Sequence, residues 1–570
     1  MTSPWRTLIP ALALCCALPA VAAREFTPQA GLWMIPSENN GQPGRGFSLD
    51  VQGNTAFLQV FNYEKSGAAT FHTAVGQLDD SAAMTVPLLR FKGGRSFGGP
   101  VQDAVSDGTA GNVTVKFANG LNGTVQFPGE SEQPISRFLI DQKLPLWWTQ
   151  SATTPPEKLK ASMEIDFAAS GTDGTRYSWK GTLHGDETGA LMLEMTPHRY
   201  LSTPDWDPST RMMQCKIETA TQVFDCLPAK PWEGERPLPD VLEFKHVRFR
   251  VLARDVVGEI QTTTHPEQRI GLNGWTQGTY SCAQLCMSPN VGSARIYSWR
   301  QAVSSSDCTI GCTGYYNVTL LPTSGAWIVD EEYTGRPGRG VFLDVQDNTV
   351  VVQTSDYLAN GEPTFHLGSK PLSPSATERT STTAKVPLQR YAGGRYFGGP
   401  AKSGVVVGLP GSIALDFAPY YGNNQYTDFA TGQITLPNES AKRMRRLALE
   451  PISTGLDYFF GEYLVRWSLL KPADSSWVRL TRVAGEFVLN DDGSIQCTRK
   501  WANQPLKLQC ALLDMENPQG PWKGIADIEI RPFDRGSTSE RLIARTRDQH
   551  GHWLGLGAVN LPGLAIAKDQ

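Results

Sequence analysis

Short runs of alternating apolar and polar residues fill most of the chain. From Phe47 to Gln52, Phe, Leu and Val alternate with Ser, Asp and Gln, and this period of two predicts a β-strand with one buried side and one solvent-facing side. Gly53–Asn54 is a two-residue hairpin signal, Thr55–Tyr63 follows as a return strand, and a turn at Lys65–Gly67 leads into a third strand at Ala69–Val75. Helix-period patterns are scarce. The pattern predicts a mostly β protein.

The same pattern occurs twice. Pro43–Gly46 (PGRG) returns as Pro337–Gly340, an offset of 294 residues. Farther along, the glycine-rich Gly93–Pro100 returns as Gly393–Pro400, so the offset has grown to 300 and one loop is longer in the second copy. Two copies that keep the same residues in the same order indicate one module, duplicated and fused.

Several antiparallel strands within about 110 residues predict a small barrel or sandwich, which we call module A. Each A module precedes a second β-rich region, module B, which carries a local cysteine pair. The predicted fold class is therefore mostly β: duplicated small antiparallel β-barrel or sandwich modules, each followed by a second β-rich module, with a cysteine-rich connector. The predicted order is signal peptide 1–23, module A1 24–140, module B1 141–275, connector 276–319, module A2 320–449 and module B2 450–570.

The N-terminus has the pattern of a secretory signal peptide. Arg6 gives a positive start, Leu8–Ala17 is an apolar run, and Val21–Ala23 is a small-residue cleavage pattern. Lipidation of Cys15 or Cys16 is the alternative, which the leucine before Cys15 disfavours. No run is long and apolar enough to predict a transmembrane segment in the mature chain. The chain is predicted to be exported, to the periplasm or the extracellular space.

Eight cysteines remain after the signal, an even number that predicts disulfides in an exported chain. In each of two local pairs, a disulfide would join the two strands of a predicted hairpin. The connector has two C-x3-C pairs, and if these segments are helical, the spacing places each pair on one face. The predicted bonds are Cys215–Cys226, Cys497–Cys510, and the nested Cys282–Cys312 and Cys286–Cys308. A four-thiolate zinc site fits the connector spacing as well, but an oxidising compartment favours disulfides.

Composition excludes several classes of protein. A net charge of −4 with 19% charged residues leaves no basic face for a nucleic acid. The chain has eight histidines but no H-E-x-x-H motif, so no catalytic metal centre is predicted. No G-x-S-x-G elbow, P-loop or dinucleotide fingerprint appears in a strand-to-helix context, so no cofactor is predicted.

The repeated motifs resemble a module that is common in uncharacterised exported bacterial proteins. In the first copy the matching positions are Gly31-x-Trp33, Gly44-x-Gly46, Gln52–Thr55 (QGNT), Tyr63, Gly67 and Phe71; in the second they are Gly325-x-Trp327, Gly338-x-Gly340, Tyr357, Gly361 and Phe365. Two departures are the arginines between the paired glycines, where an aromatic is frequent, and the phenylalanines in place of the usual tryptophan. The resemblance covers the two A modules and implies an exported β module without a settled activity.

Five residues recur in both A modules and form the predicted ligand-binding set. An arginine beside glycine can approach an anion with its fork and nearby backbone N–H groups, and a tryptophan can stack on a sugar. The structural alternative for each is core packing, a cross-strand hydrogen bond, or an arginine that covers aromatic surface. The set is Trp33, Arg45, Asp50, His72 and Arg95, with Trp327, Arg339, Asp344, His366 and Arg395 in the second copy.

These observations predict an exported non-enzymatic binding or structural protein of the bacterial cell envelope, whose duplicated β modules present ligand- or partner-binding surfaces. Duplication of whole A–B units favours binding, because bivalent display strengthens weak contacts without new chemistry. The predicted partner is a small molecule, a glycan or an envelope protein. The alternative is a secreted or periplasmic hydrolase that uses scattered His and Asp residues, with Asp50 and His72 as the duplicated pair.

Overall fold

The structure is a computed structural model. It describes residues 28–140 except 53–54, 80 and 139, strands between 163 and 277, residues 302–303 and 315–316, residues 322–449 except 347–348, 375–381 and 418–430, and segments between 455 and 560. The predicted signal peptide and the connector cysteines Cys282, Cys286, Cys308 and Cys312 lie outside the described residues, so both stay predictions.

The described chain is almost entirely β-strand, as the alternating pattern predicts. Its helical segments are short 3-10 turns: Pro36–Glu38 (η1), Asp330–Glu332 (η6) and Leu456–Phe459 (η7). No helix within the described ranges is both long enough and apolar enough to span a bilayer.

Module A1 is a closed eight-stranded antiparallel barrel, which decides between the barrel and the sandwich. Its strands follow one another around the ring in sequence order, and β2 joins β3 through a two-residue connection, as predicted. The strands are β1 Gly31–Met34, β2 Gly46–Gln52, β3 Thr55–Tyr63, β4 Ala69–Gln77, β5 Ala83–Lys92, β6 Val105–Phe117, β7 Asn122–Gln126 and β8 Gln133–Arg137.

Module A2 repeats this ring, closed where β22 pairs with β24, and adds the short β23 beside β24. Its strands are β19 Gly325–Val329, β20 Gly340–Gln346, β21 Thr349–Tyr357, β22 Pro363–Pro371, β23 Ser373–Pro374, β24 Thr382–Ala392, β25 Val405–Phe417, β26 Thr431–Thr435 and β27 Lys442–Arg446.

Module B1 is a second type of closed eight-stranded barrel, and module B2 repeats its strand order with the short β35 added. The strands of B1 are β9 Met163–Ser170, β10 Arg176–Gly185, β11 Leu191–Pro197, β12 Arg211–Glu218, β13 Val223–Pro228, β14 Phe244–Leu252, β15 Asp255–Thr262 and β16 Ile270–Gln277. Those of B2 are β28 Gly461–Trp467, β29 Asp474–Ala484, β30 Phe487–Asn490, β31 Ile495–Thr498, β32 Lys507–Leu512, β33 Gly524–Ile530, β34 Glu540–Arg547, β35 Trp553–Gly555 and β36 Ala558–Asn560. Between the modules, β17 Ala302–Val303 pairs with β18 Tyr315–Tyr316.

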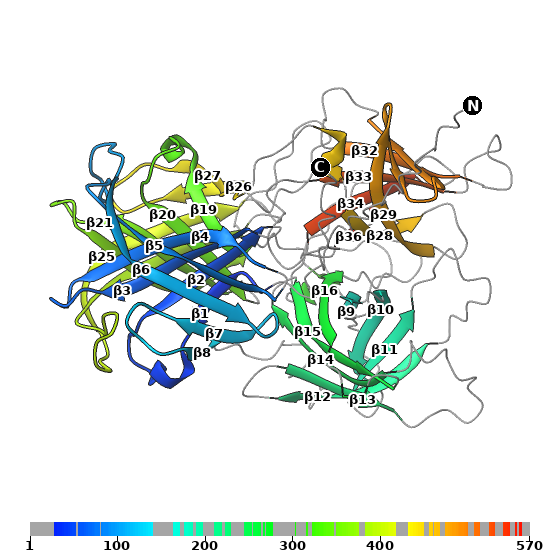
Figure 1. Ribbon diagram of the computed structural model, residues 1–570, viewed down its shortest axis with the longest axis horizontal. Coiled ribbons are helices and arrows are strands. Elements are labelled where there is room, and N and C mark those ends of the chain that lie inside the picture. The colour runs from blue at the N-terminus through cyan, green and yellow to red at the C-terminus, as the bar shows by residue number, and fades with distance from the viewer. Residues whose placement is uncertain are drawn as a thin grey trace, which may run out of the picture.

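The two A barrels lie against each other, and this contact explains the one wrong feature of the strand prediction. In β2, Phe47, Leu49 and Val51 point into the barrel core, as their period of two requires. The intervening polar residues, predicted to face solvent, are only 0–1% exposed. The second A barrel covers them, because β1 packs against β20, β2 against β19 and β4 against β22. Figure 1 shows the two A barrels side by side, with both B barrels in the other half of the molecule.

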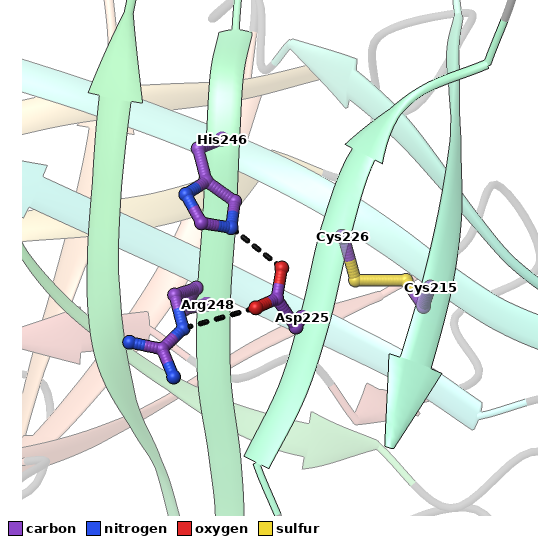
Figure 2. Close-up of a disulfide and its surroundings, with 5 residues drawn as sticks. All are labelled: Cys215, Asp225, Cys226, His246 and Arg248. Carbon is purple, nitrogen blue, oxygen red and sulfur yellow. Dashed lines mark hydrogen bonds and ion pairs between the residues drawn. A yellow bond between two sulfur atoms is a disulfide. The ribbon is translucent and has the colours of Figure 1, made fainter. Parts of the chain in front are cut away.

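Each B barrel carries a disulfide between its fourth and fifth strands. Cys215 of β12 bonds to Cys226 of β13, and Cys497 of β31 bonds to Cys510 of β32. In both pairs the cysteines are directly opposite each other in the strand register, with Cα atoms 4.0 and 3.9 Å apart. The prediction that each pair joins the two strands of a hairpin is confirmed. Figure 2 shows the disulfide of B1.

Replacing Cys215 and Cys226 together by serine should lower the free energy of unfolding of B1 by about 3 kcal/mol. The bond closes a short loop, with a sequence separation of 11 residues, and a cross-link of this length removes that much chain entropy from the unfolded state. Urea unfolding followed by hydrogen exchange of the B1 strands measures the change. The matched Cys497/Cys510 variant should act on B2 alone, and a loss shared by both barrels would contradict local clipping.

Module B1 touches the A pair through one buried arginine. Arg250 of β14 is 1% exposed, and its Nη2 donates to Oε1 of Gln346, 3.2 Å away at the end of β20. Gln346 in turn donates to the backbone oxygen of Phe138 at 2.8 Å. Burial, and repulsion from Arg137, lower the pKa of Arg250 to about 9. B1 therefore meets both A barrels at their shared interface.

Candidate functional site

Two buried ion pairs cross between the A barrels. Arg446 of β27 donates from Nη1 and Nη2 to the two carboxylate oxygens of Asp50 at 2.6 and 2.9 Å. Arg137 of β8 makes the same fork with Asp344 at 2.7 and 2.5 Å. All four side chains are 0–2% exposed. Each aspartate also accepts a hydrogen bond from a backbone N–H in the first strand of the opposite barrel. Both carboxylates are therefore paired within the interface.

The glycine that opens each G-x-W motif makes room for the arginine of the ion pair. Gly31 has φ +133°, and a Cβ there would lie 1.9 Å from the guanidinium of Arg137. Gly325 has the same φ, and its Cβ would lie 1.6 Å from Arg446. No other residue combines this backbone conformation with this space. The G-x-W glycine is therefore a requirement of the contact between the barrels.

A second type of cross-barrel site joins the arginines that the sequence singled out. Arg45 donates to Glu38 and Glu130 of its own barrel, with Nη2 at 2.7 and 2.6 Å from their carboxylate oxygens. Arg395 reaches over from the second barrel and donates from Nη1 to Glu38 at 2.7 Å. The N–H of Gly398 donates to Glu130 at 2.7 Å. Two arginines and two glutamates thus neutralise one another.

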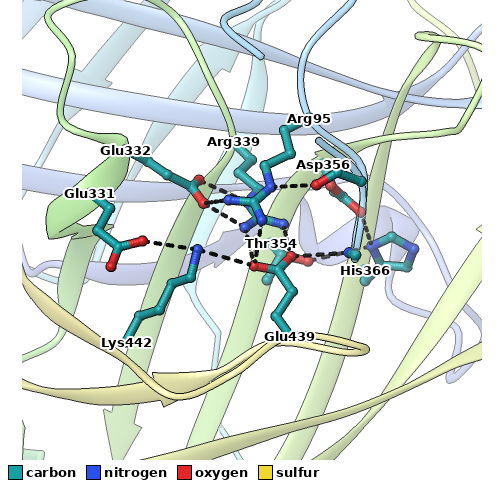
Figure 3. Close-up of polar contacts among 11 residues, drawn as sticks. Arg95, Glu331, Glu332, Arg339, Thr354, Asp356, His366, Glu439 and Lys442 are labelled. Carbon is teal, nitrogen blue, oxygen red and sulfur yellow. Dashed lines mark hydrogen bonds and ion pairs between the residues drawn. The ribbon is translucent and has the colours of Figure 1, made fainter. Parts of the chain in front are cut away.

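The second copy repeats this site with the roles of the barrels exchanged (Figure 3). Arg339 lies between Glu332 and Glu439, and Arg95 of the first barrel contacts the same two carboxylates at 3.0 and 3.2 Å. Burial raises the pKa of Glu439, but the hydrogen bond from Arg339 and the N–H of Gly98 outweigh it and hold that pKa at about 2. Lys442 adds a further contact to Glu439 at 3.6 Å.

Both histidines of the predicted set are buried beside a phenylalanine of the opposite barrel. His72 lies 5.1 Å from the ring of Phe397, and His366 lies 5.0 Å from the ring of Phe97. Each is 2% exposed. Burial and a nearby arginine lower the pKa of both histidines to about 4, so both are neutral at physiological pH.

The surroundings of His366 do not form a nucleophile–base–acid relay. Thr354 Oγ1 lies 3.4 Å from Nδ1, and Asp356 Oδ2 lies 3.9 Å from that same nitrogen. A relay needs the nucleophile and the orienting carboxylate on opposite ring nitrogens. In the first copy the equivalent positions are Val60 and Asn62, which offer neither group. Asp50 faces Arg446 instead of His72, so the structure separates the duplicated His–Asp pair.

Asp356 is a buried acid at the interface whose carboxylate is only partly hydrogen-bonded. It is 2% exposed, and its Oδ1 has no hydrogen-bond partner among the described residues. Burial raises its pKa to about 7. The first copy places Asn62 at this position, also 2% exposed. At this position the two halves of the interface therefore differ by one ionisable group.

The tryptophans of the set belong to the barrel cores. Trp33 and Trp327 are each 1% exposed, and their indole N–H groups donate to the backbone oxygens of Gln29 and Thr323 at 3.0 Å. Trp33 packs edge to face on Phe117, and Trp327 packs in the same way on Phe417. Neither ring faces a surface on which a sugar stacks.

The glycine-rich loops also serve the opposite barrel. The ring of Tyr357 lies over Gly94, where a Cβ would come within 2.2 Å of it, and Tyr63 lies over Gly394 in the same way. The N–H of Gly93 donates to the backbone oxygen of Gly361 at 2.8 Å. These loops are the sites on which two tyrosines of the opposite barrel pack.

A small cavity opens beside Arg339. Its volume is about 10 Å³, which holds one water molecule. Phe97 of the first barrel and Glu332, Arg339 and Thr354 of the second line it. The cavity is far smaller than the several hundred Å³ of a typical ligand pocket.

The structure thus brings eight of the ten predicted residues to one interface and leaves the two tryptophans in the cores. It combines them across copies: Arg45 with Arg395, and Arg339 with Arg95. The sequence comparison missed their partners, which are Glu38, Glu130, Arg137, Glu332, Glu439 and Arg446. A sequence signal for Glu130 and Glu439 was present, since Pro128–Ser131 (PGES) matches Pro437–Ser440 (PNES). That match has an offset of 309 residues, which differs from the offsets of 294 and 300 of the other motifs. The ligand-binding role of the ten residues stays a prediction.

A separate polar cluster lies on the outer face of B1, beside the disulfide (Figure 2). Asp225 Oδ1 is 2.6 Å from His246 Nε2, and Asp225 Oδ2 is 3.4 Å from Arg248 Nε. Arg248 also contacts Glu218 and Glu259. These side chains are 20–37% exposed and form a cross-strand charge ladder. Across the described ranges, no three His, Cys, Asp or Glu side chains are grouped to hold a metal ion.

Comparison with known proteins adds little to this geometry. No protein-family model matches the chain, and no curated protein matches it. Among solved structures, the chain is similar to a double mutant of the vaccine antigen transferrin binding protein B (TbpB) from Haemophilus parasuis Hp5, at 8% identity and a TM-score of 0.17, over 78% of this chain and 82% of that chain. A likeness at this TM-score carries no inference about fold or function. The resemblance to exported bacterial modules stays a prediction.

Proposed function

We propose that the protein is an exported, non-enzymatic scaffold of the bacterial cell envelope, in which each A module has the other A module as its ligand. The carrying observation is the pair of buried cross-barrel forks, Arg446 with Asp50 and Arg137 with Asp344. The charged groups of the predicted ligand-binding set are therefore paired with groups of the same chain. The two A barrels form one body that holds the two A–B halves of the chain together, and contacts with a partner fall to the remaining surfaces.

The signal-peptide pattern and the two hairpin disulfides support export, because disulfides persist in oxidising compartments. The buried, neutral histidines support a role without catalysis, since a general base must reach a substrate. The charged side chains of the interface support a permanent contact between the A barrels. Their charges are neutralised in ion pairs instead of facing an open cavity.

Cutting the chain between its halves tests the scaffold. A protease site placed after Cys312 and before β19, which begins at Gly325, separates A1–B1 from A2–B2 and leaves the connector cysteines on one side. We expect the two halves to co-elute after cleavage, because the buried forks and the exchanged tyrosines hold them together. Size-exclusion chromatography with light scattering under native conditions measures the result.

The matched variant carries Arg137→Glu and Arg446→Glu, which places like charges opposite Asp344 and Asp50. Its halves should separate after the same cut. Folded halves that separate in the unmodified sequence would refute a permanent A pair. Turnover of a glycan or peptidoglycan fragment that is lost on replacing His72 and His366 by glutamine would favour the hydrolase instead.

A further inference from the structure

The two copies of module A differ sharply along one exposed strand. In A2, the first half of β25 reads Val405, Val406, Val407, Gly408, Leu409, and its four apolar side chains are 58, 45, 46 and 74% exposed. The equivalent part of β6 in A1 reads Val105, Ser106, Asp107, Gly108, Thr109. The same hairpin therefore folds with polar residues at these positions, and the fold does not require the apolar ones.

The outer backbone edge of this stretch is unpaired in the described part of the chain. β24 pairs with β25 along its length, from Ala392 opposite Val405 to Thr382 opposite Phe417. On the other side, β26 pairs with β25 only from Ala414 to Asp416. The N–H and C=O groups that point away from β24 between residues 405 and 409 therefore lie at an open strand edge, the kind of edge on which a further strand can add. Pro410, which has no N–H, ends this stretch.

Charge protects the equivalent edge of A1 and is missing from that of A2. Asp107 contacts Lys92 at 2.6 Å and Arg90 at 3.6 Å, so β6 and its neighbour β5 present fixed charges beside the edge. In A2 the corresponding positions are Val407, Ala392 and Arg390, which leaves one arginine and no acid. Charged residues on edge strands are a common device against edge-to-edge association. The chain keeps that device in one copy only.

The open edge continues the interface between the A barrels. Gly404, next to Val405, donates its N–H to the backbone oxygen of Pro43 at 2.7 Å. Ala392, which pairs with Val405, forms an isolated antiparallel bridge to Ala68 of the first barrel. The strand is thus anchored on both barrels at one end, which holds its edge in a defined direction.

We propose that residues 405–409 of β25 form a homodimerisation edge, on which the same strand of a second copy of this chain adds in antiparallel fashion. Antiparallel pairing of a strand with its own copy follows a twofold axis, so one apolar strand edge is complementary to itself. Val405, Val407 and Leu409 share one side of the strand and would pack against their counterparts across the axis. The inference is independent of the proposed function, which concerns contacts within one chain.

Sedimentation velocity of the full-length oxidised protein over a range of concentrations tests the edge. We expect a concentration-dependent dimer. Val407→Asp, which copies Asp107 of the first module, should raise the dimer dissociation constant by tenfold or more, because two carboxylates then lie at one twofold edge. The triple graft Val406→Ser, Val407→Asp and Leu409→Thr installs the A1 sequence, which the same hairpin already accommodates, and should give a monomer that melts at the wild-type temperature.

Val75→Asp is the matched control, because Val75 is a valine of similar exposure, 49%, on β4 away from the edge. It should leave the dimer unchanged. A photo-crosslinking amino acid in place of Val407 should join two chains of this protein. A wild-type chain that is monomeric at every concentration, a dimer that persists in the triple graft, or a crosslink from position 407 only to a different protein would each overturn the proposal.

Discussion

Replacing Asp50 by alanine should destabilise the A pair by about 3–5 kcal/mol, because the change leaves the buried guanidinium of Arg446 without its counter-charge. Both side chains are 0% exposed, so water cannot take the place of the lost carboxylate. Hydrogen exchange of the β1 and β19 amides in rising urea measures the loss at the interface itself. Asp344→Ala should behave alike, since Arg137 makes the same fork with Asp344.

Two further variants separate the buried charge from mere loss of a contact. Asp50→Ala combined with Arg446→Met removes both charges and should recover much of the lost stability, because an apolar pair replaces an ion pair at little net cost. Glu64→Ala breaks the exposed pair with Arg90, whose partners are 38 and 36% exposed, and should cost under about 1 kcal/mol. A loss for Asp50→Ala as small as for Glu64→Ala would refute a desolvated interface.

Replacing Asp356 by asparagine should stabilise the protein in neutral and alkaline solution and leave it unchanged in acid. Burial raises the pKa of Asp356 to about 7, against 3.8 for the free side chain. Below pH 4 the carboxyl is protonated in both the folded and the unfolded state. As the pH rises from 4 through 7, the unfolded state loses its proton first and the folded state loses stability, up to about 4 kcal/mol.

Chemical denaturation at pH 4 and pH 8 measures this difference. Asn62 already occupies the equivalent position in the first copy, so Asp356→Asn makes the two copies alike at this position and keeps the volume of the side chain. Glu439 has the opposite linkage: its pKa is held at about 2, so its contribution is present above pH 4 and is lost in stronger acid. A gain from Asp356→Asn that is equal at both pH values would show that packing, not ionisation, distinguishes the two residues.

Local pattern was enough to predict the strands and hairpins, but not to choose between a barrel and a sandwich. The alternation of Phe47, Leu49 and Val51 with polar residues depends on β2 alone, and the cysteine spacing depends on one hairpin. Strand period and hairpin length act over a few residues, so the sequence carries them directly. The duplication predicted that one module occurs twice, and the same ring of eight strands is present in A1 and A2.

The contact between the two A modules could not be predicted from such local patterns. The sequence pattern predicts that Asp50 faces solvent, because a period of two shows which side chains point into the barrel and which point out. It does not show whether the outward-pointing side chains are covered by another domain. Only the position of Arg446, 396 residues away, decides that the outside is buried as well. A repeat shows that two residues are equivalent, but it does not show whether each serves its own copy or the other. Arg45 and Arg95 were therefore assigned to one pocket, whereas each meets an arginine of the other barrel.

The charge on the edge of β6 limits how many molecules can join. A unit with two adhesive edges, one on each barrel, would add neighbours at both ends and grow into an open-ended filament. With Asp107 on one barrel and Val407 on the other, each molecule has a valency of one, and growth stops at two. Gene fusion makes this possible, because identical separate subunits would carry every substitution on both sides of their twofold axis.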